Sequence, residues 1–93
     1  RGLSEAEYAF LARHNQIYAG SINNQRIVFY NSKSGATERH VPQAEIAFLK
    51  YKTGLSLNSA NDLWRAYLVG LGYTNQSSLT QMKYSFYCGN DTI

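Results

Sequence analysis

The sequence predicts a small all-α domain, and three features of the chain support this prediction. Apolar residues recur at helical spacing, residues that favour helix starts and stops alternate, and one segment returns 38 residues later. The 93 residues suffice for one modest core rather than two. We therefore expect a single domain, residues 1–93, built as a small five-helix bundle from a tandem 38-residue helical-hairpin repeat plus a fifth helix.

The repeat is carried by Ala6–Leu11, which returns as Ala44–Leu49 with one change in six residues, and the same offset places Phe29 against Tyr67. A repeat unit cannot bury its apolar face without neighbours, so the fifth helix, which has no counterpart, is expected to cap the stack or meet a partner. The expected parts are repeat 1 at about 4–35, repeat 2 at about 42–73 and the extra helix at 78–88.

The first helix is expected at residues 4–14, where Ser4 and Glu7 match the pattern of a capping box. Glu45 occupies the position equivalent to Glu7 in the second repeat. A capping or first-turn role, near the positive end of the helix dipole, accounts for both carboxylates.

The second helix is expected at residues 21–32, with Ser21 as its N-cap. Its segment Ile27–Tyr30 is β-branched and aromatic, so a buried strand is the alternative. Register with the fourth helix favours a helix, and an isolated strand would leave its backbone groups unpaired.

The other three helices open with Pro42, which suits a first helical position, and with the N-cap residues Ser59 and Ser78. The expected starts lie about 19 residues apart, which fits three helical turns and a short connection. Glycines follow the expected helices, where a left-handed conformation ends a helix at low cost. The expected ranges are 42–53, 59–71 and 78–88.

Composition and motifs exclude several classes of function. Charged residues make up 16% of the chain, and the net charge of +3 is scattered, so neither a membrane span nor a basic nucleic-acid stripe is expected. The lone Cys88 is expected to pack in the interior. Neither His14 nor His40 belongs to a zinc motif, and no nucleophile or phosphate-binding motif occurs. We expect no enzyme, no metal site and no cofactor.

Tyrosine is abundant, with eight residues, and tyrosine is common at interfaces. Tyr67 is expected in the core, whereas Tyr84 and Tyr87 fall off the apolar face of the fifth helix and are interface candidates. The alternative is that rings in so short a chain fill the core. The residues predicted to bind a partner are Arg65, Tyr73, Lys83, Tyr84 and Tyr87.

The segment SANDLWRAYLVGLGY from Ser59, followed by SLTQMKYSFY from Ser78, resembles the short capped helix pairs of tailed-bacteriophage structural proteins. It departs from their pattern at Gln81, where an acid is favoured. The resemblance, mainly over residues 59–87, implies a non-enzymatic virion part, such as a head fibre, decoration or tail-attached module, in a homo-oligomer that contacts other virion subunits.

Three functions stay open at this point. The first is a virion structural or attachment module acting through protein-protein contacts. The second is a host-surface module that binds cell-wall or glycan sugars by stacking Trp64 and exposed tyrosines on them. The third, for which the scattered charge argues least, is a nucleic-acid-binding helical domain with these basic residues on phosphates: Arg26, Lys50, Lys52, Arg65 and Lys83.

Overall fold

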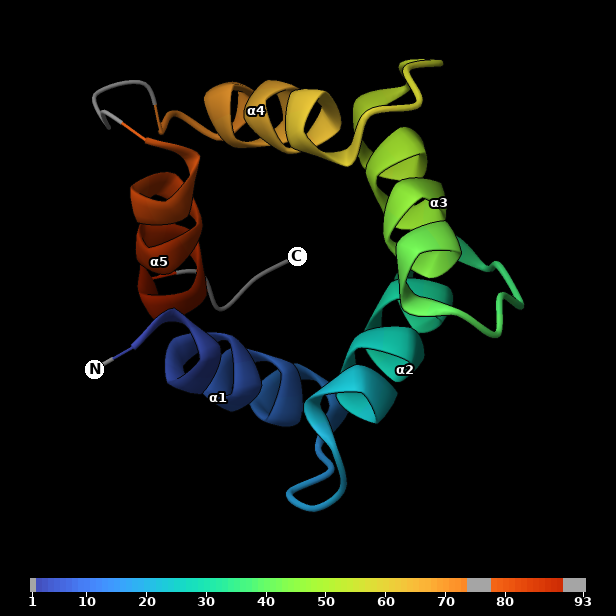
Figure 1. The fold of residues 1–93 in the computed structure, drawn as a ribbon, viewed down its shortest axis with the longest axis vertical. Coiled ribbons are helices and arrows are strands. Elements are labelled where there is room, and N and C mark those ends of the chain that lie inside the picture. The colour runs from blue at the N-terminus through green and yellow to red at the C-terminus, as the bar shows by residue number, and fades with distance from the viewer. Residues whose placement is uncertain (1, 74–77, 90–93) are drawn as a thin grey trace.

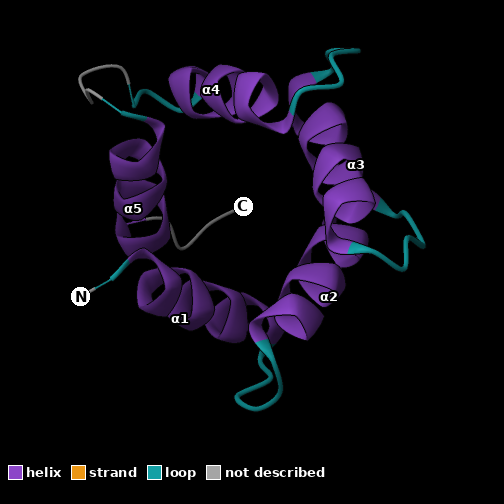
Figure 2. Ribbon diagram, in the orientation of Figure 1, coloured by secondary structure: helices purple, strands orange, loops and turns teal. Residues whose placement is uncertain are grey.

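The computed structural model describes residues 2–73 and 78–89, and this part of the chain consists of helices and loops (Figures 1 and 2). The predicted all-α class and the five predicted helices are confirmed, each boundary within two residues, and the alternative of a strand at Ile27–Tyr30 is wrong. The helices are α1 (Leu3–Asn15), α2 (Ile22–Ser34), α3 (Val41–Thr53), α4 (Ala60–Gly70) and α5 (Leu79–Gly89).

The five helices form the sides of a closed ring (Figure 1). Each described helix packs against the helices before and after it in the chain, and α5 also packs against α1. The expectation that the fifth helix lacks a partner helix is therefore wrong, because α5 lies between α4 and α1. α2 packs against α3 as it does against α1, so the expected hairpins are not separate packing units.

The helices begin at regular intervals of 19 residues, as the spacing of the start signals predicts. Each step of 19 residues along the chain moves one place around the ring, so residues separated by this interval occupy equivalent positions. The first residues of the helices are Leu3, Ile22, Val41, Ala60 and Leu79.

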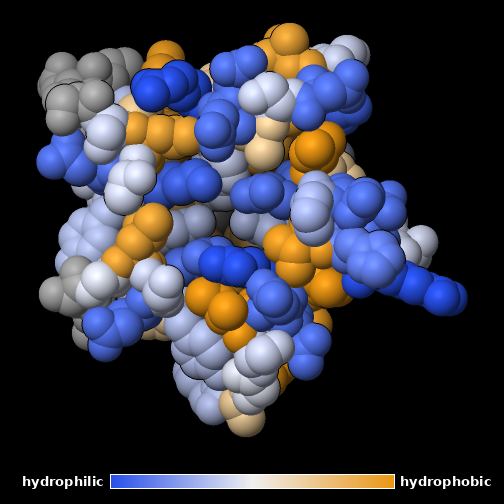
Figure 3. All heavy atoms as spheres, in the orientation of Figure 1, coloured by the Kyte–Doolittle hydropathy of each residue, from blue (hydrophilic) through white to orange (hydrophobic). Residues whose placement is uncertain are grey.

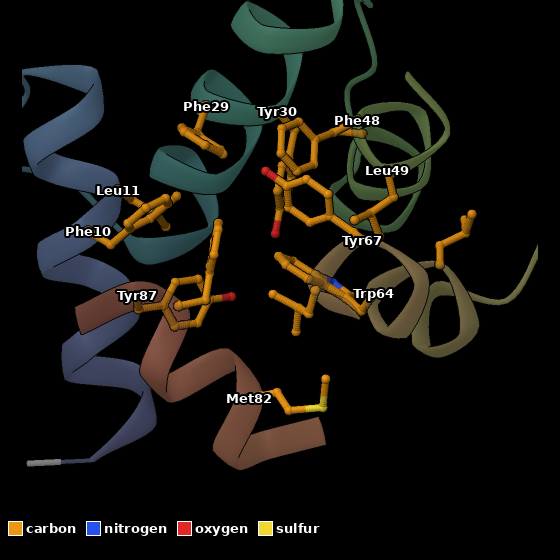
Figure 4. Close-up of a cluster of buried hydrophobic side chains, with 14 of the residues drawn as sticks. Phe10, Leu11, Phe29, Tyr30, Phe48, Leu49, Trp64, Tyr67, Met82 and Tyr87 are labelled. Carbon is orange, nitrogen blue, oxygen red and sulfur yellow. The ribbon is translucent and has the colours of Figure 1, made fainter. Parts of the chain in front are cut away.

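One such equivalent position is aromatic in every helix and forms the centre of the core (Figure 4). The residues, which we call the aromatic belt, are Phe10, Phe29, Phe48, Tyr67 and Phe86. None is more than 8% exposed. Successive rings contact each other with centroids 5.3, 5.4, 5.8 and 5.7 Å apart, and the last ring lies 5.1 Å from the first. The belt is therefore closed, and each tilted or edge-on contact adds about 0.5–1.5 kcal/mol to the burial of apolar area.

Serine caps open three of the helices as predicted. The hydroxyl oxygens of Ser21, Ser59 and Ser78 each accept a hydrogen bond from the backbone N–H three residues later, at 3.1, 3.3 and 3.2 Å. Such a bond satisfies one of the N–H groups that the first helical turn leaves unpaired. Gly35 and Gly54 end α2 and α3 in the left-handed conformation, with φ of 79° and 71°.

The predicted cap at Ser4 is wrong. α1 begins one residue earlier, at Leu3, and its N-cap is Gly2, whose N–H donates to Oε1 of Glu5 at 3.2 Å. Ser4 therefore lies inside the helix, exposed to solvent. Glu7, the other half of the expected capping box, is buried and pairs elsewhere.

Candidate functional site

The position three residues before each aromatic belt residue carries a polar group in all five helices. We call this set the inner polar ring: Glu7, Arg26, Glu45, Trp64 and Lys83. The four charged members line a hollow of about 280 Å³ together with two apolar residues and a tyrosine, namely Leu3, Val41 and Tyr87. Figure 3 shows a face of the molecule that is hollowed near the centre of the ring and bordered largely by hydrophilic residues.

Glu7 and Arg26 form a two-pronged ion pair in this hollow. Arg26 donates from Nε to Glu7 Oε2 and from Nη2 to Glu7 Oε1, both at 2.7 Å, and its Nη1 donates to Asn23 Oδ1 at 2.9 Å. The hydrogen bonds to Glu7 raise the pKa of the Arg26 guanidinium, against the opposing effect of burial. Glu7 is only 7% exposed, so both of its oxygens are engaged where water has little access.

Glu45, Trp64 and Lys83 form a second polar group in the hollow. Trp64 donates its indole Nε1–H to Glu45 Oε2 at 2.8 Å, and the Lys83 ammonium lies 4.8 Å from the centroid of the Trp64 ring. Burial lowers the pKa of Lys83, because desolvation outweighs the attraction of Glu45 and Glu7. In the described part of the chain, Lys83 forms no ion pair and no hydrogen bond to compensate for its burial.

These contacts overturn the interpretation of Glu7 and Glu45 as capping or first-turn acids. Each carboxylate binds a donor that lies 19 residues later, Arg26 for Glu7 and Trp64 for Glu45. Partial correspondence of the two pairs is visible in the sequence, since both follow the 38-residue offset. The signal that would have found the site is the recurrence of polar side chains at 19-residue spacing, which the larger repeat conceals.

A second depression lies where α3 meets α4, and its lining is mixed in character. Its volume is about 300 Å³, and we call it the α3–α4 groove. The lining residues are Lys52, Thr53, Leu55, Ala66, Tyr67, Gly70 and Leu71. Leu55 and Leu71 are 42% and 46% exposed, and Tyr51 and Leu57, in the same stretch of chain as Leu55, are 64% and 43% exposed.

The predicted partner-binding residues differ in their exposure. Arg65 is exposed on α4, whereas Tyr73 and Tyr84 are half-buried and pack against the core. Lys83 belongs to the inner polar ring. Tyr87 is only 4% exposed, so the expectation that it falls off the apolar face of its helix is wrong. The reason is that α1 covers this side of α5: the Tyr87 ring lies 5.3 Å from that of Phe10.

Two further expectations about single residues are wrong. Trp64 is 1% exposed and packs among the aromatic side chains, so its ring has no free face for stacking on a sugar. Cys88 is exposed near the end of α5, rather than packed in the interior. Tyr67 lies in the core as predicted.

In comparisons with protein-family models, curated proteins and solved structures, none matches this chain. Within residues 2–73 and 78–89, no three His, Cys, Asp or Glu side chains gather as a metal site would require. Among the helices described, none has the length and apolar character needed to cross a membrane. The chain is defined by its architecture, an all-α ring with a polar hollow, and by its two depressions.

Proposed function

We propose that this domain is a non-enzymatic structural or attachment module of a tailed-bacteriophage particle and acts through contacts with other virion subunits. The observation that carries the protein-contact part is the exposure of leucine side chains at the α3–α4 groove. The resemblance over residues 59–87, which includes α4 and α5, supports the virion part.

The groove is suited to receive an apolar side chain of another protein. Leu55 and Leu71 expose close to half of their area on its walls, and burying such a side chain yields about 1–2 kcal/mol. Isolated exposed leucines are ordinary, but several around one depression are typical of an interaction site. The aromatic belt is closed, so an apolar contact with a partner falls to the periphery of the ring.

The charge around the groove indicates the chemistry of the partner segment. Lys52 lines the groove, Lys50 precedes it by two residues, and no acidic residue occurs from residue 46 to residue 61. A partner segment with an apolar side chain flanked by acidic residues complements this surface, because opposite charges at the rim favour association and orient the partner. Copies of the parent protein are expected to assemble with rotational symmetry, as virion subunits commonly do.

Incorporation into phage particles tests this proposal. The protein that contains this domain is produced during infection, particles are purified, and its amount per particle is measured by mass spectrometry. The double variant Leu55→Asp/Leu71→Asp should lower incorporation at least about tenfold, which corresponds to about 1.4 kcal/mol of lost contact free energy. Val28→Asp is the matched control, since Val28 is 42% exposed on α2 and lies outside the groove.

The possible results separate the two parts of the proposal. If the unmodified protein is missing from purified particles, the virion assignment is wrong. If the protein is present and the double variant is incorporated as well as Val28→Asp, the groove is not the contact surface. Both variants are first compared by circular dichroism, so that unfolding is not mistaken for a lost contact.

A further inference from the structure

The hollow inside the inner polar ring has unused capacity for hydrogen bonds of both kinds. The Lys83 ammonium has three N–H donors, yet its described contact is with the face of the Trp64 ring. Glu45 accepts one hydrogen bond, at Oε2, although a carboxylate can accept about four. These two opposite charges line the same hollow, but they do not pair directly within 4.0 Å.

We propose that this hollow binds a small zwitterion of the aliphatic α-amino acid class, with its carboxylate toward Lys83 and its ammonium toward Glu45. This site is separate from the α3–α4 groove and does not depend on the proposed virion role.

The distribution of charge in the hollow selects a zwitterion over a simple ion. Two carboxylates and two cationic side chains line it, so a lone anion meets Glu7 and Glu45, and a lone cation meets Arg26 and Lys83. A molecule with both charges a few ångströms apart can satisfy Lys83 and Glu45 together. Each such charge-assisted hydrogen bond is stronger than a neutral one, and more so where water is partly excluded.

Glu7 and Arg26 act as a fixed wall of this site rather than as ligand groups. Their two hydrogen bonds of 2.7 Å already satisfy the Glu7 oxygens, so the pair contributes little net charge to the hollow. The remaining imbalance is concentrated on Glu45 and Lys83, where a ligand gains most.

The size and apolar lining of the hollow restrict the ligand further. Its volume of about 280 Å³ equals the share of about nine water molecules in the liquid, which suits a molecule of a few non-hydrogen atoms. Leu3 and Val41 also line it, and they offer contact to a short aliphatic side chain. Alanine and valine fit this description, whereas an aromatic amino acid does not.

Trp64 provides a direct reporter, because it is the only tryptophan and its indole N–H is bonded to Glu45. The protein is titrated with L-valine while the indole N–H signal is followed by two-dimensional NMR. A saturable shift in the millimolar range is expected, equivalent to about 4 kcal/mol of binding free energy. Acetate and methylamine, which each carry one charge, should need at least tenfold higher concentrations.

Variants test the two ligand groups separately. Glu45→Gln and Lys83→Met should each weaken valine binding at least tenfold, with alanine as a second probe. Lys50→Gln serves as the matched control, because Lys50 bonds to Asn58 at the periphery and should leave binding unchanged. Circular dichroism checks that each variant is folded.

The probes remain decisive if a variant fails to fold, since they require only the unmodified protein. An indole signal that does not move with valine or alanine at tens of millimolar refutes the proposal. It is also refuted if acetate alone moves the signal as strongly as valine, since the hollow would then be a simple anion site.

Discussion

Glu7 shows how one side chain can be both buried and fully hydrogen-bonded. Its exposed fraction is 7%, and Arg26, whose side chain is 28% exposed, reaches both of its oxygens. A buried ion pair adds little when compared with an apolar pair of the same size, but removal of one partner leaves the other charge poorly solvated. The partial exposure of Arg26 moderates this penalty, because water can approach the guanidinium.

Glu7→Gln is expected to lower the free energy of unfolding by about 1–3 kcal/mol, because it leaves Arg26 without its anionic partner. Urea denaturation at neutral pH measures this change. Glu38→Gln is the control, since the Glu38 contacts shown by the structure are made by its backbone to Asn31, and its effect should stay within about 0.5 kcal/mol. Equal effects of the two substitutions would contradict the importance of the pair.

At the scale of elements, helix starts and connections are stabilised by local polar contacts. Gln25, only 2% exposed, donates to the carbonyl oxygens of Ile17 and Ala19 and accepts from Asn15, so it holds the connection between α1 and α2. Buried polar side chains of this kind are costly unless all their partners are present. Each helix can thus begin correctly before the ring closes.

Ser21→Ala is expected to destabilise the domain by about 1 kcal/mol, because it removes the hydrogen bond that caps α2. Thermal unfolding followed by circular dichroism checks this value. Ser4→Ala is the matched control: Ser4 lies inside α1, where alanine is the better helix former, so the substitution should be neutral or slightly stabilising. A loss of stability in Ser4→Ala comparable to that in Ser21→Ala would restore Ser4 as the cap.

At the scale of the whole molecule, the closed aromatic belt joins the first helix to the last. Phe86 contacts Phe10 on one side and Tyr67 on the other, so the two ends of the described chain share one core. Arg13 of α1 also donates to the backbone carbonyl of Tyr87 at 3.3 Å. The domain should therefore unfold cooperatively rather than helix by helix.

The buried tyrosines of this core make the domain sensitive to alkaline pH. Burial raises the pKa of Tyr67 to about 12, and it raises the pKa values of Tyr30 and Tyr87 well above their usual range. Unfolded tyrosine titrates near pH 10, so above this pH the unfolded state loses protons that the folded state keeps. Stability is thus fully present below about pH 10 and falls by about 1.4 kcal/mol per pH unit for each such tyrosine above it.

Urea denaturation between about pH 8 and pH 11 checks this dependence, and the free energy of unfolding should fall above pH 10. Tyr67→Phe should make the decline shallower, because one buried hydroxyl is removed. Tyr51→Phe, at a tyrosine that is 64% exposed, is the comparison that should leave the decline unchanged. A flat profile up to pH 11 would show that the buried tyrosines do not control alkaline stability.

The sequence by itself determined the five helices, since their starts depend on local chemistry. Ser21, Ser59 and Ser78 announce helices through a side chain and a backbone group three residues apart, and Tyr67 follows from helical spacing. Such signals act within one or two turns. They are therefore visible in a single chain without knowledge of its packing.

Only the tertiary structure decided how the helices close and where their polar side chains go. Glu7 looks like a capping residue from its neighbours, yet its partner Arg26 lies on the next helix. Tyr87 looks exposed on its own helix, yet α1 covers it because the ring closes. Burial and charge pairing depend on contacts between segments far apart in the chain, so the hollow formed by the inner polar ring exists only when all five helices are in place.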